Sequence, residues 1–285
     1  MRERINDIIS ILGWLKRHVC LSSRERKNRI TLNTIKEKKL HILMNGPSCS
    51  ETIGCIASND DVMMVNSAAN SELFWRLKPR YYCIIDPIFW GNDNWNMDKN
   101  TRDSVVKLWE NLKKVDWELQ FFIESKLISD KIDMMPQCVT FIRFNGNGLY
   151  CKKFTGFMLR QYKKNNATPI YTNIAIIALY LGIQLRYSNI YLHGLDFDKL
   201  ANYTINENND VVLLDKHFYD NGVYENYTEY GYAKRGEFYV FVESFANALR
   251  QFSVLRKYAD MLGVNIYNYS KYSMIDSFEK KVDIC

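Results

Sequence analysis

Short apolar runs that alternate with helical segments are the feature that most constrains the fold of this chain. From residue 40 onward, runs of strand length recur between stretches whose apolar residues follow helical spacing. We predict strands at residues 40–45, 61–66, 81–86, 119–123, 139–143, 189–193 and 264–267, and helices at residues 70–77, 101–115, 173–186 and 237–262. This alternation is typical of an α/β fold in which helices cover both faces of a mostly parallel, Rossmann-like sheet.

A basic amphipathic segment, residues 1–39, precedes this pattern. Residues 5–19 place apolar side chains at roughly helical spacing, and the first 40 residues carry a net charge of +7, whereas the rest of the chain carries −1. Such a helix can lie in an anionic membrane surface, or it can pack on the body or on a partner subunit. We keep both interpretations for this segment and assign residues 40–285 to a single domain.

One long polar stretch interrupts the alternation. Residues 198–235 are rich in Tyr, Asn and Asp and show no sustained apolar period. Segments of this length inside a compact domain are usually functional lids or disordered excursions. The many aromatic residues favour a lid that becomes ordered over a ligand, placed before the last helix.

Charge and cysteine content exclude several classes of protein. The near-neutral body argues against a nucleic-acid-binding face. The seven cysteines are odd in number, scattered and without a C-x-x-C pair, which indicates neither a disulfide framework nor a zinc site. The sequence has neither a membrane-spanning apolar run nor a secretory signal. We therefore expect a cytoplasmic protein, peripheral to the inner face of the cytoplasmic membrane if residues 1–39 bind it.

Polar residues at the ends of the predicted strands are the candidates for ligand binding, because open α/β sheets bind ligands beyond the carboxyl ends of their strands. The first strand ends in Asn45-Gly46-Pro47-Ser48. Gly46 allows a close approach of backbone to a ligand, and we expect Ser48 to cap a helix whose first amides favour a phosphate. By contrast, we interpret Asp60-Asp61 as a solvated turn.

The strand ends together resemble those of the bacterial family 42 sialyltransferases. That family has an Asn-Gly-Pro-Ser loop after its first strand, Asn after the second, a polar residue before Pro after the third, and Gly-Ile-Asp-Phe after a late strand. This chain has, in the same order, Asn45-Gly46-Pro47-Ser48, Val65-Asn66, Asp86-Pro87 and Gly194-Leu195-Asp196-Phe197. The resemblance covers about residues 40–270, but the Arg that the family carries before its apolar helix has no counterpart in residues 166–173.

The resemblance implies an inverting glycosyltransferase with a GT-A-like fold and no required cofactor or metal. It would transfer sialic acid, or a related nonulosonic acid, from a CMP-activated donor to a sugar of a bacterial surface glycan or glycolipid, in lipopolysaccharide or capsule biosynthesis. Carried over to this chain, the nucleotide- and donor-binding residues are Asn45, Gly46, Ser48, Asn66, Asp86, Thr172, Asn173, Gly194 and Asp196.

Inverting transfer requires a base that accepts the proton of the acceptor hydroxyl, and histidine suits neutral pH. Of the four histidines, His18 lies in the N-terminal segment and His41 opens the first strand, at the wrong end of the sheet. His193 ends a late strand, where it faces the core or forms local hydrogen bonds, and its role stays open. His217, in the predicted lid, is our candidate base, and the family's base is also a histidine in this region.

The departing phosphate needs hydrogen-bond donors, and members of the family use tyrosine hydroxyls for this purpose. The nearest candidates are Tyr203 and Tyr219, both in the predicted lid.

Three other functions stay open. Asp196-Phe197-Asp198 is an Asp-x-Asp sequence, which would hold Mg²⁺ or Mn²⁺ in a transferase that uses a nucleoside diphosphate sugar. A pyrophosphokinase-like enzyme would share the Asn-Gly-Pro-Ser-like loop, and a non-catalytic binding protein would use neither motif. The oligomeric state is also open, and it includes a homo-oligomer.

Overall fold

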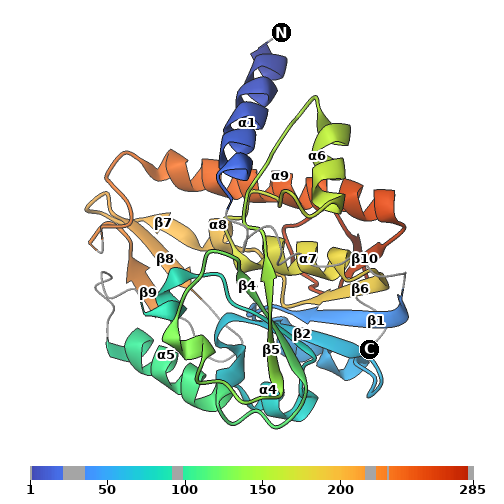
Figure 1. The fold of residues 1–285 in the computed structure, drawn as a ribbon. Coiled ribbons are helices and arrows are strands. Elements are labelled where there is room, and N and C mark those ends of the chain that lie inside the picture. Colours follow the sequence, from blue (N-terminus) through green and yellow to red (C-terminus); the bar gives the residue numbers. More distant parts are fainter. Residues whose placement is uncertain (1, 22–35, 92–98, 216–222, 230, 282–285) are drawn as a thin grey trace.

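A single parallel sheet is the centre of the protein (Figure 1). The computed structural model describes residues 2–21, 36–91, 99–215, 223–229 and 231–281. Within these residues the sheet has eight strands in the order β11-β10-β6-β1-β2-β3-β4-β5, and every neighbouring pair is parallel. The strands are β1 (Lys36–Leu43), β2 (Asp61–Val65), β3 (Tyr81–Cys83), β4 (Leu119–Glu124), β5 (Val139–Phe144), β6 (Tyr187–His193), β10 (Asn265–Asn268) and β11 (Glu279–Lys280). The predicted α/β class and mostly parallel sheet are confirmed.

The strand order reverses at β1. From β1 the chain builds β2 to β5 toward one edge, and it then returns to place β6 and β10 on the other side of β1. The register pairs Leu43 of β1 with Met64 of β2 and with His193 of β6, so the carboxyl ends of these three strands lie side by side. Such a reversal leaves a crevice at the strand ends, which is where open α/β sheets bind ligands.

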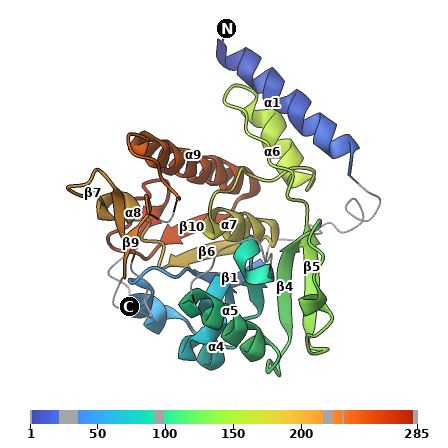
Figure 2. The ribbon, with the colours of Figure 1, turned by 90° about the vertical axis from the view of Figure 1, so that its left-hand side faces the viewer.

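Helices cover both faces of the sheet, which explains why the strands are apolar runs rather than alternating ones. Figure 2 shows α7 and α9 on one side and α4 and α5 on the other. The predicted helices are confirmed with small shifts of their ends, whereas α6 was missed. The helices of the body are α3 (Cys49–Thr52), α4 (Glu72–Leu77), α5 (Lys99–Leu112), α6 (Thr155–Lys163), α7 (Ile174–Gln184), α8 (Lys199–Asn202) and α9 (Phe238–Leu262).

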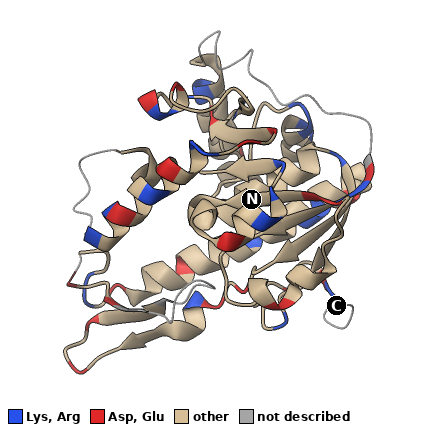
Figure 3. Cartoon of the chain, turned by 90° about the horizontal axis from the view of Figure 1, so that it is seen from below, with Lys and Arg blue, Asp and Glu red and all other residues tan. Residues whose placement is uncertain are grey.

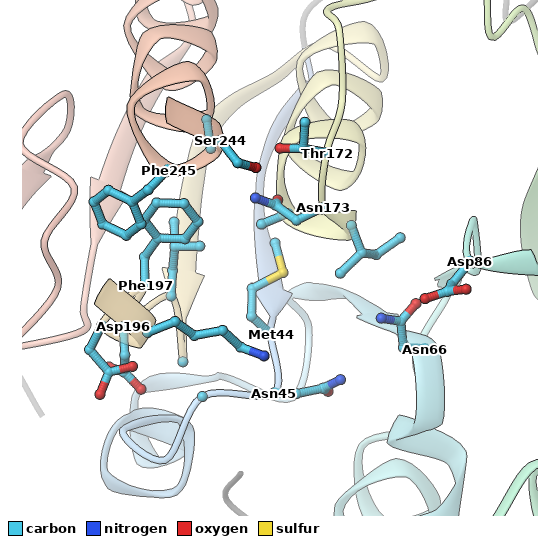
Figure 4. Close-up of a pocket in the computed structure, with 18 of the residues that line it drawn as sticks. Met44, Asn45, Asn66, Asp86, Thr172, Asn173, Asp196, Phe197, Ser244 and Phe245 are labelled. Carbon is cyan, nitrogen blue, oxygen red and sulfur yellow. The ribbon is translucent and has the colours of Figure 1, made fainter. Parts of the chain in front are cut away.

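Helix α7 is apolar on all sides because it lies between the sheet and α9. All of its residues after Ile174 are buried. Its amino end, capped by the Asn173 side chain, is directed toward the carboxyl ends of β1 and β6 (Figure 4). This helix therefore connects the hydrophobic core with the crevice.

The segment predicted as a lid contains regular structure that the sequence pattern did not reveal. Strands β7 (Tyr203–Ile205), β8 (Val211–Asp215) and β9 (Val223–Asn226) form a small antiparallel sheet. Val211 and Leu213 of β8 are buried, and Val212 between them is half-buried. The buried residues of β8 support the small sheet, and the role of residues 198–235 as a lid stays a prediction.

The N-terminal segment forms helix α1 (Arg2–Val19), which packs against the loop before α6. The carboxylate of Asp7 accepts hydrogen bonds from the backbone N–H groups of Lys152, Lys153 and Phe154 at 2.9, 2.6 and 2.9 Å. Because three amides share one buried carboxylate, α1 is fixed to the body by a polar contact. Within the described residues, every helix is too short or too polar to cross a bilayer.

Seen from below, basic and acidic residues are interspersed over the described part of the chain (Figure 3).

Candidate active-site pocket

A pocket of about 760 Å³ lies beyond the carboxyl ends of β1, β2 and β6 (Figure 4). The amino end of α7 and the first turns of α9 close it from the other side. Most of the predicted site residues line it, namely Asn45, Gly46, Asn66, Asp86, Thr172, Asn173, Gly194, Asp196 and Tyr203. The structure thus brings together residues that are about 160 positions apart at most, at the place that the strand order favours.

Two glycines allow the loops after β1 and β6 to cross in contact. The N–H of Gly46 donates to the carbonyl of Gly194 at 3.0 Å. A Cβ atom on Gly46 would lie 2.3 Å from an Asp196 carboxylate oxygen and 2.4 Å from that carbonyl. Gly194 has φ +63°, and a Cβ atom there would lie 2.7 Å from the Cβ of Cys49. Only glycine fits at both positions, so the floor of the pocket is bare backbone.

Asp196 and Ser48 connect these two loops. The N–H of Ser48 donates to Oδ2 of Asp196 at 3.0 Å, and its hydroxyl donates to Oδ1. Both residues are buried, and burial raises the pKa of Asp196 although the Ser48 bonds oppose that shift. Ser48 makes no side-chain cap for α3, so the predicted capping role was wrong. Its hydroxyl instead donates to Asp196 on the other loop, because a buried carboxylate needs hydrogen-bond partners.

Two asparagine amides in the pocket have an oxygen without a hydrogen-bond partner. Oδ1 of Asn45 and Oδ1 of Asn66 are both buried, and neither accepts a hydrogen bond. Asn66 has φ +49°, in the left-handed region that asparagine tolerates better than most residues. Figure 4 shows Asn66 beside Asp86, while Asn45 lies at the end of β1. Buried acceptors without partners are uncommon and indicate a group that a ligand completes.

Asp86 holds its own turn. Its Oδ1 accepts from the N–H of Ile88 at 3.0 Å and so caps the short 3₁₀ helix Pro87–Trp90. One oxygen of this carboxylate is therefore engaged locally, and the side chain still lines the pocket.

The amino end of α7 supplies backbone donors to the pocket. The Asn173 side chain accepts from the N–H of Ile176 at 3.2 Å, and Thr172 precedes it in the lining. The first N–H groups of a helix lack partners within it and carry the positive end of the helix dipole. This end of the pocket is therefore suited to an anionic group such as a phosphate.

An aromatic wall opposite α7 was missed by the sequence analysis. The rings of Phe197 and Phe245 stack with centroids 4.6 Å apart, and Phe241 and Tyr227 also line the pocket. Phe245 and Phe241 lie in the first turns of α9, which the sequence pattern predicted only as a long helix. The sequence signal was present, because Phe238, Phe241 and Phe245 recur at helical spacing.

Tyr203 belongs to the same wall. Its ring contacts Tyr227, Phe238 and Phe241, with centroid separations of 5.8, 5.9 and 5.1 Å. The other two predicted catalytic residues, His217 and Tyr219, lie outside the described residues, so their roles stay predictions.

A chain of buried polar groups lies under the loop crossing. Asp60 accepts from Nε2 of His41 at 3.1 Å, and the two histidines are joined by a 2.8 Å bond between Nδ1 of His41 and Nε2 of His193. Nδ1 of His193 lies 2.8 Å from the Thr52 hydroxyl. The carboxylate fixes the tautomers: His193 donates to His41 and accepts from Thr52, and both rings are neutral.

Burial explains why both imidazoles stay neutral. It lowers the pKa of His193 to about 3, with a further contribution from His41, and it also lowers the pKa of His41 despite Asp60. The predicted alternative of a His193 that faces the core is confirmed, whereas its hydrogen bonds join distant segments rather than local ones. His41 is its partner in β1 rather than a residue at the wrong end of the sheet.

The interpretation of Asp60-Asp61 as a solvated turn was wrong. The Asp60 side chain is only 7% exposed and accepts from His41, whereas Asp61 accepts a hydrogen bond from the hydroxyl of Tyr187. Both carboxylates fix neighbouring strands because their partners lie on β1 and β6.

Two solved sialyltransferases align with this chain over most of its length. The sialyltransferase CstII from Campylobacter jejuni, solved with cytidine-5'-monophosphate, aligns with a TM-score of 0.43 and 14% identity over 85% of this chain and 84% of that one. An apo alpha-2,3-sialyltransferase from the same organism aligns with a TM-score of 0.42 and 16% identity over 90% and 84%. No protein-family model and no curated protein matches the sequence.

Proposed function

We propose that this protein is a glycosyltransferase of the sialyltransferase type, which transfers sialic acid or a related sugar from a CMP-activated donor to a sugar of a surface glycan. The observation that carries the proposal is the pair of unpartnered oxygens on Asn45 and Asn66, set at the ends of adjacent parallel strands. Both asparagines line a pocket with bare glycine backbone and the amino end of α7. Amide acceptors, backbone amides and a helix dipole together suit a nucleoside monophosphate.

Each end of such a donor has matching chemistry in the pocket. The amide oxygens would accept from the ribose hydroxyls or the base amino group, which are hydrogen-bond donors. The N–H groups at the start of α7 would bind the phosphate, whose oxygens are acceptors only. The aromatic wall of Phe197, Phe245 and Tyr203 would leave an apolar surface for the sugar rings or the base.

In the proposed reaction an acceptor hydroxyl oxygen attacks the anomeric carbon of the donor. A bond forms between them, the bond from that carbon to the phosphate oxygen breaks, and CMP leaves with the electron pair. The hydroxyl proton passes to a base, for which His217 is our candidate. Because attack and departure occur on opposite faces, the configuration at the carbon is inverted.

The alternative with a divalent metal at Asp196 and Asp198 has weaker support. Both oxygens of Asp196 accept from Ser48, and an Asp198 oxygen accepts from the Asn202 side chain at 3.2 Å. In the part of the chain that the structure describes, no three His, Cys, Asp or Glu side chains are grouped to hold a metal. The Asp196 carboxylate already serves the connection between the loops.

Calorimetric titration with CMP, UDP, GDP and ATP, each with and without Mg²⁺, tests the proposal. We expect CMP to bind in either condition. Binding of UDP or GDP that requires Mg²⁺ would contradict the proposal and favour Asp196 and Asp198, whereas turnover of ATP would indicate the pyrophosphokinase reaction.

Two variants test the asparagine amides directly. Asn45→Ala removes one amide, and Asn66→Gly removes the other while keeping a residue that accepts φ +49° without strain. Each should weaken CMP binding by roughly tenfold, the effect of losing one good hydrogen bond. Asn208→Ala, at an exposed turn between β7 and β8, is the matched control and should bind normally.

His217→Ala should leave CMP binding intact and reduce turnover by about 10² to 10⁴, the usual contribution of a general base. His18→Ala, in the N-terminal helix, is its control. Equal loss of CMP binding in His217→Ala would show that His217 holds the donor rather than moving a proton.

A further inference from the structure

Helix α1 contacts the body with a mostly polar face, to which Trp14 and Ile11 add apolar contacts with the core. Asp7 binds three backbone amides, and Glu3 forms ion pairs with Lys152 and Lys153. One turn later, the Ser10 hydroxyl donates to the carbonyl of Tyr150 at 2.8 Å. The polar residues of this helix are thus used for the intramolecular contact, which in most surface helices is apolar.

The inner face continues in the same way toward the end of the helix. The indole N–H of buried Trp14 donates to the carbonyl of Asn166, and the Arg17 guanidinium donates to Asn147 and Gly148 at 2.9 and 3.0 Å. Residues 3, 7, 10, 14 and 17 follow helical spacing, so they form one continuous stripe.

The opposite face of α1 is apolar and exposed. Figure 2 shows the helix projecting from the body beside α6. The outer face of α1, as we use the term, consists of six side chains that are between 40% and 70% exposed: Ile5, Ile8, Ile9, Leu12, Leu15 and Val19. Six large apolar side chains on one exposed helix face exceed the scattered exposure usual on soluble proteins and indicate a contact surface.

The charges around this face are all positive. Arg2 and Arg4 lie about one turn before Ile5 and Ile8, Lys16 lies one turn after Leu12, and all three are exposed. The two acids of the helix, Glu3 and Asp7, are directed at the body and have partners there. An apolar face bordered only by cations is complementary to an anionic, apolar surface.

We propose that the outer face of α1 binds the surface of an anionic lipid bilayer, with the helix lying in the plane of the interface. The apolar side chains would enter the acyl boundary, and Arg2, Arg4 and Lys16 would reach the lipid phosphates. A second copy of the chain fits this face less well, because a two-fold contact would place the cations of both copies together without an acid between them. The inference does not rest on the proposed donor or reaction.

Vesicle sedimentation of the full-length protein tests the proposal. The vesicles are phosphatidylcholine alone or phosphatidylcholine with about a third of phosphatidylglycerol, at low and high salt. We expect binding to the anionic vesicles that weakens with salt, because screening reduces attraction between exposed charges. Equal binding to both vesicles, insensitive to salt, would overturn the electrostatic part of the proposal.

Leu12→Glu places a charge in the middle of the outer face and should reduce binding to the anionic vesicles by more than tenfold. Leu12 is 60% exposed, so the fold should tolerate the change, and an unchanged melting temperature verifies this. The control is Val106→Glu on α5, where an equally prominent apolar residue, 53% exposed, takes the same charge. The control should bind like the wild type.

Lys16→Gln should weaken binding to the anionic vesicles about fivefold, the effect expected for one basic residue near the surface. Lys107→Gln, exposed on α5, makes the same change in net charge and should have no effect. The proposal is overturned if the wild type fails to bind the anionic vesicles. A dimer that Leu12→Glu dissociates in analytical ultracentrifugation, without vesicle binding, would assign the outer face to a second copy.

Discussion

Acid should destabilise this protein through the His41–His193 pair, because both imidazoles are buried and neutral. In the unfolded chain His193 titrates near the ordinary histidine pKa of 6.5, whereas burial lowers its folded pKa to about 3. Between these values the unfolded chain binds a proton that the native chain does not, so stability is complete above about pH 6.5 and is lost as the pH falls below it. His41, whose pKa burial also lowers, acts in the same direction.

The size of the effect follows from linkage. At pH 5 the native His193 is still neutral, so the loss relative to pH 7.5 is set by the unfolded pKa and amounts to about 2 kcal/mol, with a slope near 1.4 kcal/mol per pH unit. Urea unfolding followed by tryptophan fluorescence across this range measures it. His193→Gln keeps one donor and one acceptor but cannot be protonated. Between pH 7.5 and pH 5 its free energy of unfolding should therefore fall by about 2 kcal/mol less than that of the wild type.

Carboxylates that titrate in the same range contribute equally to both proteins and cancel in the difference. Two results would refute the reasoning: a wild-type stability that is flat from pH 7.5 to pH 5, or the same decline in wild type and His193→Gln. Either would mean that the histidine chain is hydrated or already charged in the native protein.

Two further predictions concern the contacts that position the N-terminal helix and the pocket floor. Asp7→Ala should weaken the docking of α1 on the body by about 2 to 3 kcal/mol, because three N–H groups lose a charged acceptor. Faster hydrogen exchange of the α1 amides measures this loss, and Asn6→Ala, at an exposed neighbouring position, should not change the exchange. Gly46→Ala should lower the melting temperature and CMP affinity, since its Cβ meets Asp196 at 2.3 Å. Gly54→Ala, with nothing within 4 Å, should behave like the wild type, and equal effects would contradict the close-approach argument.

The sequence predicted the sheet well because its strands are buried on both faces and so appear as continuous apolar runs. Met63 and Met64 illustrate this, since adjacent residues of β2 pack in the cores on opposite faces. The ends of the strands could also be predicted, because a polar residue follows each apolar run. The order of strands then determined that these ends meet in one pocket.

Contacts between distant segments could not be predicted. Ser48 and Asp196 are separated by 148 positions, and nothing local shows that the serine binds a carboxylate rather than capping its helix. The small sheet of β7, β8 and β9 was hidden because its strands are short and only β8 has a run of apolar residues. The docking of α1 was hidden for a related reason, since the pattern of an amphipathic helix does not reveal that its polar face is the one that meets the body.

The position of β1 between β2 and β6 has a consequence for biosynthesis. His41 and His193 are 152 residues apart, so β1 lacks its β6 neighbour until that much more chain has left the ribosome. At usual bacterial and eukaryotic rates of synthesis this takes about 8 to 30 s. During that time the central strand of the sheet has an open edge, and the two crossing loops cannot meet. The pocket can therefore form only after β6 has been synthesised, because the loops after β1 and β6 together make its floor.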